Sequence, residues 1–139
     1  MATLVHLTAE KHASRILRRG ITMSRGSFCG IHVAGGIFCM PVLPHYYRTH
    51  QWVRELKRHG RGTMVAIYFQ VPADERVLVG QYGQPHQEMI VGEAIKTVRD
   101  ADDGLGYELI VQRAIANDEI LRVRRPSQVL GWRYSRAQC

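Results

Sequence analysis

The sequence predicts a single α+β domain with six or seven strands and two or three helices. Strand-like segments rich in β-branched and aromatic residues recur along the chain, and residues 63–71 (TMVAIYFQV) are the clearest of them. Segments with helical spacing are few and do not alternate regularly with the strands, which disfavours a parallel βαβ sheet. A length of 139 residues with 45% hydrophobic content suits one core, so residues 1–139 are expected to form one domain.

The first twenty residues are expected to form a strand and then a helix. Residues 1–7 are strand-like, and Thr8 suits the cap of the helix that follows. Gly20 is a typical helix stop. The apolar positions of this helix have the spacing of a buried stripe: Ala13, Ile16, Leu17 and Ile21. Three arginines are expected on its solvent side: Arg15, Arg18 and Arg19.

Glycines and short apolar runs dominate the next segment. Residues 26–43, which include the run CGIHVAGGIFCMPVL, predict two short strands joined by a turn at Gly35 and Gly36. Pro41 and Pro44 then break the pattern. Residues 45–60 (HYYRTHQWVRELKRHG) return to helical spacing and end at a glycine.

The second half of the chain is expected to be mainly strands. Residues 86–100 (HQEMIVGEAIKTVRD) suit either a helix or a strand followed by a short helix. Residues 100–106 contain three Asp and two Gly and predict a loop. The other expected strands are residues 75–83 (ERVLVGQYG), 107–115 (YELIVQRAI), the end of 117–126 (NDEILRVRRP) and 128–134 (QVLGWRY).

The basic charge of the chain is unevenly distributed. Lys and Arg number 19 against 12 Asp and Glu, a net charge of +7. Residues 1–61 carry ten basic and two acidic side chains. Residues 62–109 carry three basic and eight acidic ones, and residues 110–139 carry six basic and two acidic ones. If the two ends lie together they form one basic face, and its many arginines suit bidentate contacts to phosphate. A solvated, solubilising surface explains the same pattern equally well.

The sequence carries no sign of a membrane or a secreted protein. No charged and then apolar leader follows Met1, and no apolar run approaches the roughly 18 residues of a membrane span. Cys29, Cys39 and Cys139 are too few and too unevenly spaced for a disulfide framework, although Cys29 and Cys39 could meet across neighbouring strands. We therefore expect a cytoplasmic protein with reduced thiols and no membrane partner.

Familiar metal and catalytic signatures are missing from the sequence. Cys29, His32, Cys39 and His45 have the side chains that zinc prefers, but their spacing matches no closed zinc pattern, so no metal site is expected. There is no phosphate-binding glycine loop ending in Lys-Ser/Thr and no Gly-x-Ser-x-Gly elbow. A cysteine–histidine nucleophile remains open, because its partners would meet only in space.

Each remaining candidate residue has an ordinary structural explanation. A histidine on a strand, as His6 is in LVHLT, is more often a hydrogen-bonded core or edge residue than a ligand-binding one. Glu108 begins a strand after an acidic loop, where a solvated carboxylate is common. The aromatic candidates suit the core or the anchoring of a helix to the sheet: Phe38, Tyr46, Tyr47 and Trp52.

In chain order, however, several segments resemble the ADP-ribosyltransferase-fold enzymes. VHLT followed by AEKHASRILRRGI is similar to the family's opening strand, which ends in histidine, and its first helix. GIFCMPVLPHYYRTHQWVREL and MVAIYFQVP are similar to its second conserved strand, its aromatic-bearing helix and the strand after it. GYELIVQRAIANDEI is similar to the late strand that carries a glutamate in the DNA-modifying toxin branch. The resemblance covers most of the chain and implies split mixed or antiparallel sheets.

The resemblance implies NAD as the substrate and His6 and Glu108 as catalytic residues. Breaking the nicotinamide–ribose bond builds positive charge on the ribose, which the Glu108 carboxylate would stabilise. His6 would donate to a ribose hydroxyl and to nearby backbone, and the two side chains would converge on one cleft. An aromatic ring would stack on nicotinamide, and arginines would meet the pyrophosphate. The implied NAD-binding residues are His6, Thr8, Arg15, Arg25, Phe38, Tyr46, Tyr47 and Trp52.

At Phe38 the chain departs from the histidine–tyrosine–glutamate pattern of the family, which has tyrosine on this strand. Phenylalanine can stack but cannot donate a hydroxyl hydrogen bond, so the subclass stays open. The leading hypothesis is an NAD-dependent ADP-ribosyltransferase that modifies a macromolecule, with DNA or RNA as candidate acceptors. The alternatives are the RNA 2′-phosphotransferase branch of the same fold and a basic nucleic-acid-binding module without catalysis.

Overall fold

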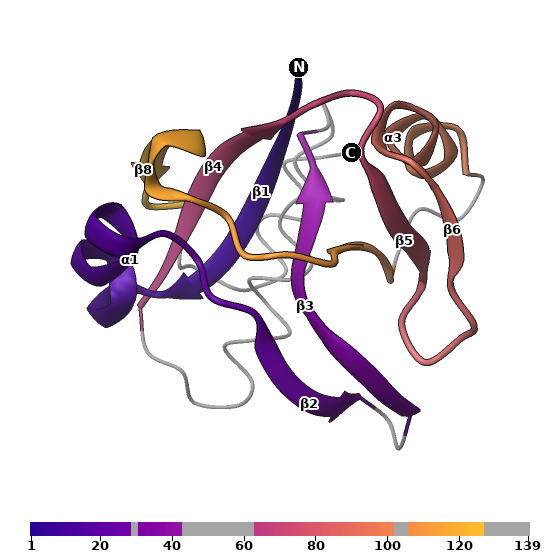
Figure 1. Cartoon of the computed structure of the whole chain (residues 1–139), viewed down its shortest axis with the longest axis horizontal. Helices are drawn as coiled ribbons and strands as arrows, with labels where there is room; N and C mark the ends of the chain where they lie inside the picture. Colours follow the sequence, from indigo (N-terminus) through magenta and orange to yellow (C-terminus); the bar gives the residue numbers. More distant parts are fainter. Residues whose placement is uncertain (29–30, 43–62, 102–105, 127–139) are drawn as a thin grey trace, which may run out of the picture.

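The computed structural model describes residues 1–28, 31–42, 63–101 and 106–126 (Figure 1). The strands in this part of the chain are β1 (Ala2–Ala9), β2 (Ser24–Phe28), β3 (Ile31–Pro41), β4 (Met64–Val71), β5 (Arg76–Gln81), β6 (Gln87–Ile90), β7 (Tyr107–Val111) and β8 (Ile120–Arg124). The helices are α1 (Ala13–Arg19) and α3 (Val91–Asp100), with short 3-10 turns η1 (Glu10–His12) and η2 (Asn117–Glu119). None of the helices in these ranges has the length and apolar character needed to cross a membrane.

The strands form an antiparallel sheet, which confirms the predicted α+β class. Seven strands lie in the order β6-β5-β7-β3-β1-β4-β8, and β2 pairs with β3 beside this path. Every strand pair in the described ranges is antiparallel. No regular βαβ alternation occurs in those ranges, as expected from the sequence.

Strand β3 changes partners along its length and joins the two halves of the sheet. Its first half pairs with β2, the stretch from Ile37 to Cys39 pairs with β7, and Met40 and Pro41 pair with β1. The pairing of β1 with β3 comprises only Leu4 with Pro41 and Val5 with Met40. Beyond Val5, β1 therefore parts from β3 while it stays paired with β4 as far as Ala9.

The two faces of the sheet bury different sets of side chains. One face carries the main core, in which both helices participate through residues such as Ile16 of α1 and Ala94 of α3. Its largest fully buried side chains include Leu4, Ile37, Ile67, Phe69 and Leu109. The other face carries a smaller buried cluster of Val5, Met40 and Ala66, with Leu7 and Tyr68 packed against it. This alternation follows from the two-residue period of a strand.

The predicted cap at Thr8 is wrong. Thr8 lies within β1 and pairs with Val65, and the residues that precede η1 and α1, Ala9 and His12, make no side-chain cap. Strand β4 offers a partner to every residue of β1, and this tertiary pairing outweighs the local preference of threonine for a helix cap. The helix then ends as predicted at Gly20, whose φ of 82° favours glycine. Leu17, expected in the buried stripe, is 50% exposed.

The predicted turn at Gly35 and Gly36 is also wrong, because β3 runs through both glycines without interruption. A Cβ atom on Gly36 would lie 2.4 Å from Cγ2 of Ile110 on β7. Gly36 therefore permits the close approach of a neighbouring strand, which is a second common reason for glycine in a strand. The connection between β2 and β3 falls instead at residues 29–30, outside the described residues.

Most other predicted elements are confirmed. The strand at residues 63–71 appears as β4, and residues 86–100 form a strand and then a helix, β6 and α3. The strand predicted at residues 107–115 is shorter, because β7 ends at Val111 and Ile115 makes only an isolated bridge with Ile21. The helix expected at residues 45–60 and the strand expected at 128–134 lie outside the described residues.

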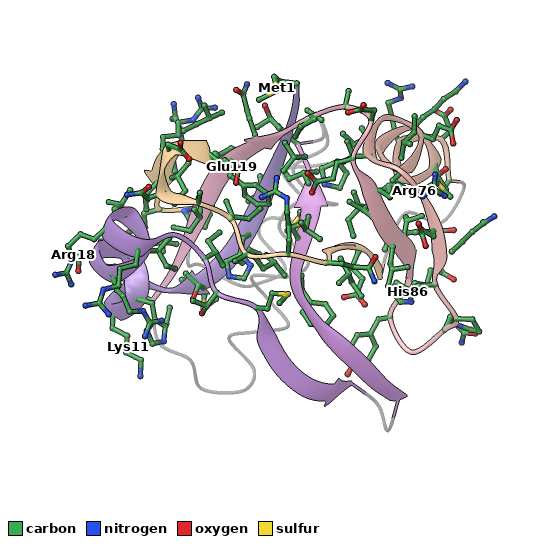
Figure 2. All side chains as sticks on the ribbon, in the orientation of Figure 1. Met1, Lys11, Arg18, Arg76, His86 and Glu119 are labelled. Atoms are coloured by element: carbon green, nitrogen blue, oxygen red, sulfur yellow. The ribbon has the colours of Figure 1, made fainter. Side chains whose placement is uncertain are left out.

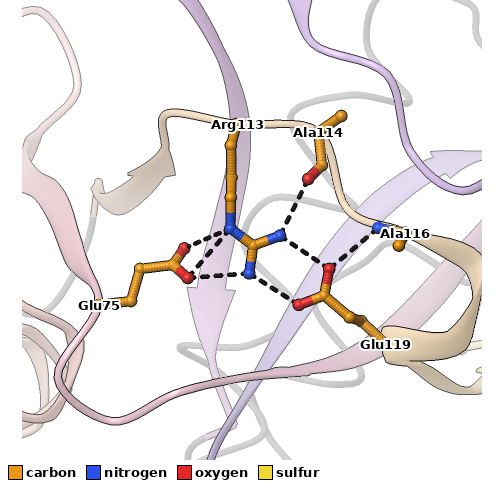
Figure 3. A network of polar contacts seen from close by, with 5 residues as sticks. All are labelled: Glu75, Arg113, Ala114, Ala116 and Glu119. Carbon is orange, nitrogen blue, oxygen red and sulfur yellow. Dashed lines mark hydrogen bonds and ion pairs between the residues drawn. The ribbon is translucent and has the colours of Figure 1, made fainter.

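Arg113 forms a clamp that ties the segment ahead of β5 to η2, which follows β7 in the chain (Figure 3). Its guanidinium donates to both carboxylate oxygens of Glu75, ahead of β5, and to both of Glu119 in η2, at 2.7–3.1 Å. It also donates to the Ala114 carbonyl, and Glu119 in turn accepts from the Ala116 backbone N–H. All five donors of Arg113 are therefore used. Arg113 holds the pKa of Glu119 below its ordinary value.

Replacing Arg113 by Met is expected to destabilise the fold by about 1 to 2 kcal/mol near neutral pH, after allowance for solvent screening. The pKa of Glu119 is lowered in the folded protein. The contribution of the Arg113–Glu119 pair to the free energy of unfolding is therefore present above about pH 4.3, and it is lost as the pH falls further. Urea denaturation of both proteins at several pH values should show the difference shrinking in acid. The control is Arg76→Met, which breaks an exposed ion pair with Glu88 and should change stability little.

Candidate functional site

His6 stands where β1 parts from β3, and its ring is fixed in one orientation. Nδ1 lies 2.8 Å from the backbone carbonyl oxygen of Phe38 on β3. A carbonyl oxygen can only accept, so Nδ1 carries the proton of this hydrogen bond. Backbone pairing between β1 and β3 ends at Val5 and Met40, and the His6 ring makes the next contact between the two strands.

The environment of His6 favours a neutral ring. Burial lowers the pKa of His6 below its ordinary value, and the hydrogen bond to Phe38 opposes this shift only in part. A neutral ring with its proton on Nδ1 has a lone pair on Nε2, and the described residues supply no hydrogen-bond partner for that nitrogen. We expected the ring to donate both to backbone and to a ribose hydroxyl. With one proton only the backbone bond is possible, and Nε2 can instead accept from a hydroxyl.

Glu108 on β7 is a buried carboxylate, not the solvated one that its position after an acidic loop suggested. Its exposed fraction is 4%, and it is the one polar residue in the buried set of the described chain. The pKa of Glu108 is raised above its ordinary value, because burial raises it by more than the charge and the hydrogen bond of His86 lower it. Oε1 of Glu108 lies 3.1 Å from Nε2 of His86.

His86 was not singled out from the sequence. It follows the turn between β5 and β6, and its Nδ1 lies 2.8 Å from the Gln84 carbonyl oxygen. Gly80, which pairs with Glu108, permits the ring to approach, because a Cβ atom there would lie 3.0 Å from Cγ of His86. A glycine inside an otherwise β-branched strand often marks such a close approach, and this was the available signal.

His6 and Glu108 lie on the two strands that flank β3 but do not face each other directly. Two interstrand spacings separate their strands, about 10 Å. Paired residues on neighbouring strands share a face of the sheet, and side chains alternate between faces along a strand. Phe38 pairs with Ile110 and Met40 pairs with Val5. The side chain of Glu108 therefore points to the same face as that of Val5, and the side chain of His6 points to the opposite face. The expected direct convergence is therefore not met. A ligand that touches both residues must lie at the place where β1 and β3 part.

Cys39 lies between these residues on β3 but is unsuited to nucleophilic catalysis. It is a free, buried thiol whose Sγ donates to the Leu109 carbonyl at 3.5 Å. Burial and then the charge of Glu108 raise the pKa of Cys39, which disfavours the reactive thiolate. Within the described residues no three His, Cys, Asp or Glu side chains gather as a metal site would require.

The remaining predicted NAD-binding residues are only partly described. Phe38 shares its face with Glu108 and is half-buried. Thr8 is half-buried two residues beyond His6, on the same side of β1, and Arg15 is exposed on α1. Arg25 belongs to β2, but its side chain is not described. Tyr46, Tyr47 and Trp52 fall outside the described residues.

Within the described residues, segments 10–19 and 117–125 of the two basic parts lie side by side, which is the condition under which one basic face was expected. Asn117 Nδ2 donates to the Arg18 carbonyl at 3.0 Å, and Arg125 forms an ion pair with Glu10. Helix α1 and strand β8 thus occupy one side of the molecule, on the left in Figure 1. In Figure 2 Lys11 and Arg18 project outward from α1 and the turn before it. We call this surface the α1–β8 face; its exposed cations are Lys11, Arg15, Arg18, Arg19 and Arg125. Arg122 and Arg124 of β8 lie opposite Tyr68 and Ala66 and therefore point to the other face of the sheet.

Comparison with known proteins leaves the chain without an assigned family. No protein-family model matches it, and neither a curated protein nor a solved structure shows significant similarity.

Replacing His6 by Asn tests the neutral ring. Asn keeps an N–H that can reach the Phe38 carbonyl but does not titrate. Because burial lowers the pKa of His6 in the folded protein, the unfolded chain takes up the proton first as the pH falls below about 6.5. The wild type should therefore lose stability below that pH, and His6→Asn should lose less of it. Urea denaturation between about pH 7.5 and pH 5 measures the slope, with His12→Asn as the control. Equal slopes in wild type and His6→Asn would contradict a neutral His6 in the folded protein.

Proposed function

We propose that the chain is an NAD-dependent ADP-ribosyltransferase that modifies a macromolecular acceptor. The observation that carries this proposal is the 2.8 Å bond from His6 Nδ1 to the Phe38 carbonyl. It leaves Nε2 as an acceptor for a ribose hydroxyl at the point where β1 and β3 part. In this proposal the buried Glu108, two strands away and oppositely oriented, is the carboxylate for a ligand that lies where β1 and β3 part.

The chemistry needs a negative charge near the reacting carbon. The bond between nicotinamide nitrogen and C1′ of ribose breaks, and its electron pair stays with nicotinamide. An oxygen or nitrogen of the acceptor then bonds to C1′, and its proton passes to the Glu108 carboxylate. A carboxylate held inside the protein stabilises the positive charge on the ribose more strongly than one in water. Phe38, on the same face as Glu108, offers a ring for stacking on nicotinamide.

The positions of the arginines support transfer to a macromolecule over the RNA 2′-phosphotransferase alternative. That alternative relies on arginines and a histidine that together hold a phosphate beside the reacting ribose. Among the described residues, most exposed arginines lie instead on α1 and on or just after β8. Such a surface suits the phosphate backbone of a bound acceptor.

The decisive variant is Glu108→Gln. NAD should raise the melting temperature of the wild type, because a ligand that binds only the folded state stabilises it. The wild type should also release nicotinamide. Glu108→Gln should keep most of the thermal stabilisation. It should release nicotinamide at least about 100-fold more slowly, since it removes charge stabilisation from the transition state.

The matched control is Glu88→Gln, the same substitution at an exposed glutamate on β6 that pairs with Arg76. It should turn over normally. Normal nicotinamide release by Glu108→Gln would refute the catalytic assignment, and absence of both stabilisation and release in the wild type would refute the use of NAD.

A second candidate function is a nucleic-acid-binding module without catalysis. The α1–β8 face is the observation that favours it. Residues 10–19 contribute four cations and one acid to it, so α1 and the turn before it carry a net charge of +3.

The triple variant Arg15→Gln, Arg18→Gln, Arg19→Gln tests this face. Single-stranded DNA or RNA should bind the wild type with an affinity that falls steeply with salt. The slope of log affinity against log salt should become shallower by about 0.7 for each phosphate that the variant no longer neutralises. A double variant at Arg76 and Arg99, exposed arginines elsewhere on the molecule, is the control. An unchanged slope would exclude the α1–β8 face as the nucleic-acid interface.

A further inference from the structure

The hydrogen bond between His86 and Glu108 constrains where their protons lie. Nδ1 of His86 faces the Gln84 carbonyl at 2.8 Å, so this nitrogen must carry a hydrogen. Nε2 faces Oε1 of Glu108 at 3.1 Å. If the ring were neutral and the carboxyl ionised, two lone pairs would face each other at this distance. One further proton must therefore lie between the two residues, on the ring or on the carboxyl.

The surroundings of the pair make this proton consequential. The side chain of His86 is 15% exposed and that of Glu108 is 6% exposed, so water screens their interaction poorly. The flanking strands place Gly80 of β5 and Met40 of β3 on this face. Among the described residues, the other titratable group linked to Glu108 is Cys39 of β3, a thiol whose pKa the charge of Glu108 helps to raise.

We propose that His86 is a positioning residue whose protonated ring donates Nε2–H to Glu108 and keeps this buried carboxyl ionised for the reaction. The Gln84 carbonyl contributes by fixing the ring, so that both ring nitrogens donate. His86 does not touch the reacting atoms, and its effect passes through Glu108. The role in catalysis rests on the function proposed above, whereas the pairing itself does not.

Removal of His86 should leave the burial of Glu108 uncompensated. Burial raises the pKa of Glu108, and the charge and hydrogen bond of His86 are what lower it. Without His86 the carboxyl should stay protonated to a pH at least about one unit higher. The acid limb of the pH profile of nicotinamide release should move upward by the same amount, because only the ionised form stabilises the ribose cation.

The test uses the full chain and two substitutions. His86→Phe keeps an aromatic ring but removes charge and donor, whereas His86→Gln keeps an N–H donor without the charge. The carboxyl carbon of Glu108 is titrated by ¹³C NMR, with its signal assigned by its loss in Glu108→Gln. We expect an ionised carboxyl near pH 7 in the wild type, an upward shift in His86→Phe and a smaller shift in His86→Gln. His12→Phe should leave the titration unchanged.

The positioning role and the NAD-dependent function fail in distinguishable ways. If the Glu108 titration is the same in His86→Phe as in the wild type, or if Glu108 is already protonated in the wild type near pH 7, the positioning role is refuted. Should His86→Phe not fold, the titration of His86→Gln decides the question by the same criterion. If the titration shifts as expected but no protein releases nicotinamide at any pH, the pairing stands and the NAD-dependent function falls.

Discussion

The shared use of strand β3 is the constraint on which the rest of this structure depends. Residues 37–41 of β3 connect β7 to β1, and with them the two halves of the sheet. The order β7-β3-β1 places these two partners on opposite edges of β3. Backbone pairing between β1 and β3 comprises only Leu4 and Val5 of β1, and beyond that point a side chain, His6, meets the Phe38 carbonyl. The close packing of Gly36 against Ile110 supports the same stretch.

Two histidines on either side of β3 show how one kind of contact leads to different chemistry. Each donates Nδ1–H to a backbone carbonyl, His6 to Phe38 and His86 to Gln84. The difference lies at Nε2. His6 has no partner there among the described residues, so a neutral ring leaves a lone pair for a ligand. Nε2 of His86 faces the carboxyl group of Glu108, so one further proton must lie between these two groups. Backbone carbonyls thus set the orientation of both rings, and the neighbour of Nε2 sets the proton count.

Much of the fold could be predicted because local composition and tertiary context agree. Strand β4 follows from its β-branched and aromatic residues, and the end of α1 from Gly20. The predictions failed where a residue has two common uses. Gly36 suits a turn or a close approach between strands, and only the position of Ile110 decides between them. Thr8 suits a helix cap or a strand, and pairing with Val65 decides.

The sequence by itself determined the α+β class, the order of most elements and the strongly basic ends, because these depend on residue type and spacing along one chain. The choice of His6 and Glu108 as candidates came from the resemblance to a family. Tertiary structure alone decided that Glu108 is buried, that His86 is its partner and that His6 and Glu108 have opposite orientations. Those properties depend on register between strands, and a shift of one residue reverses every side chain, so no local pattern contains them.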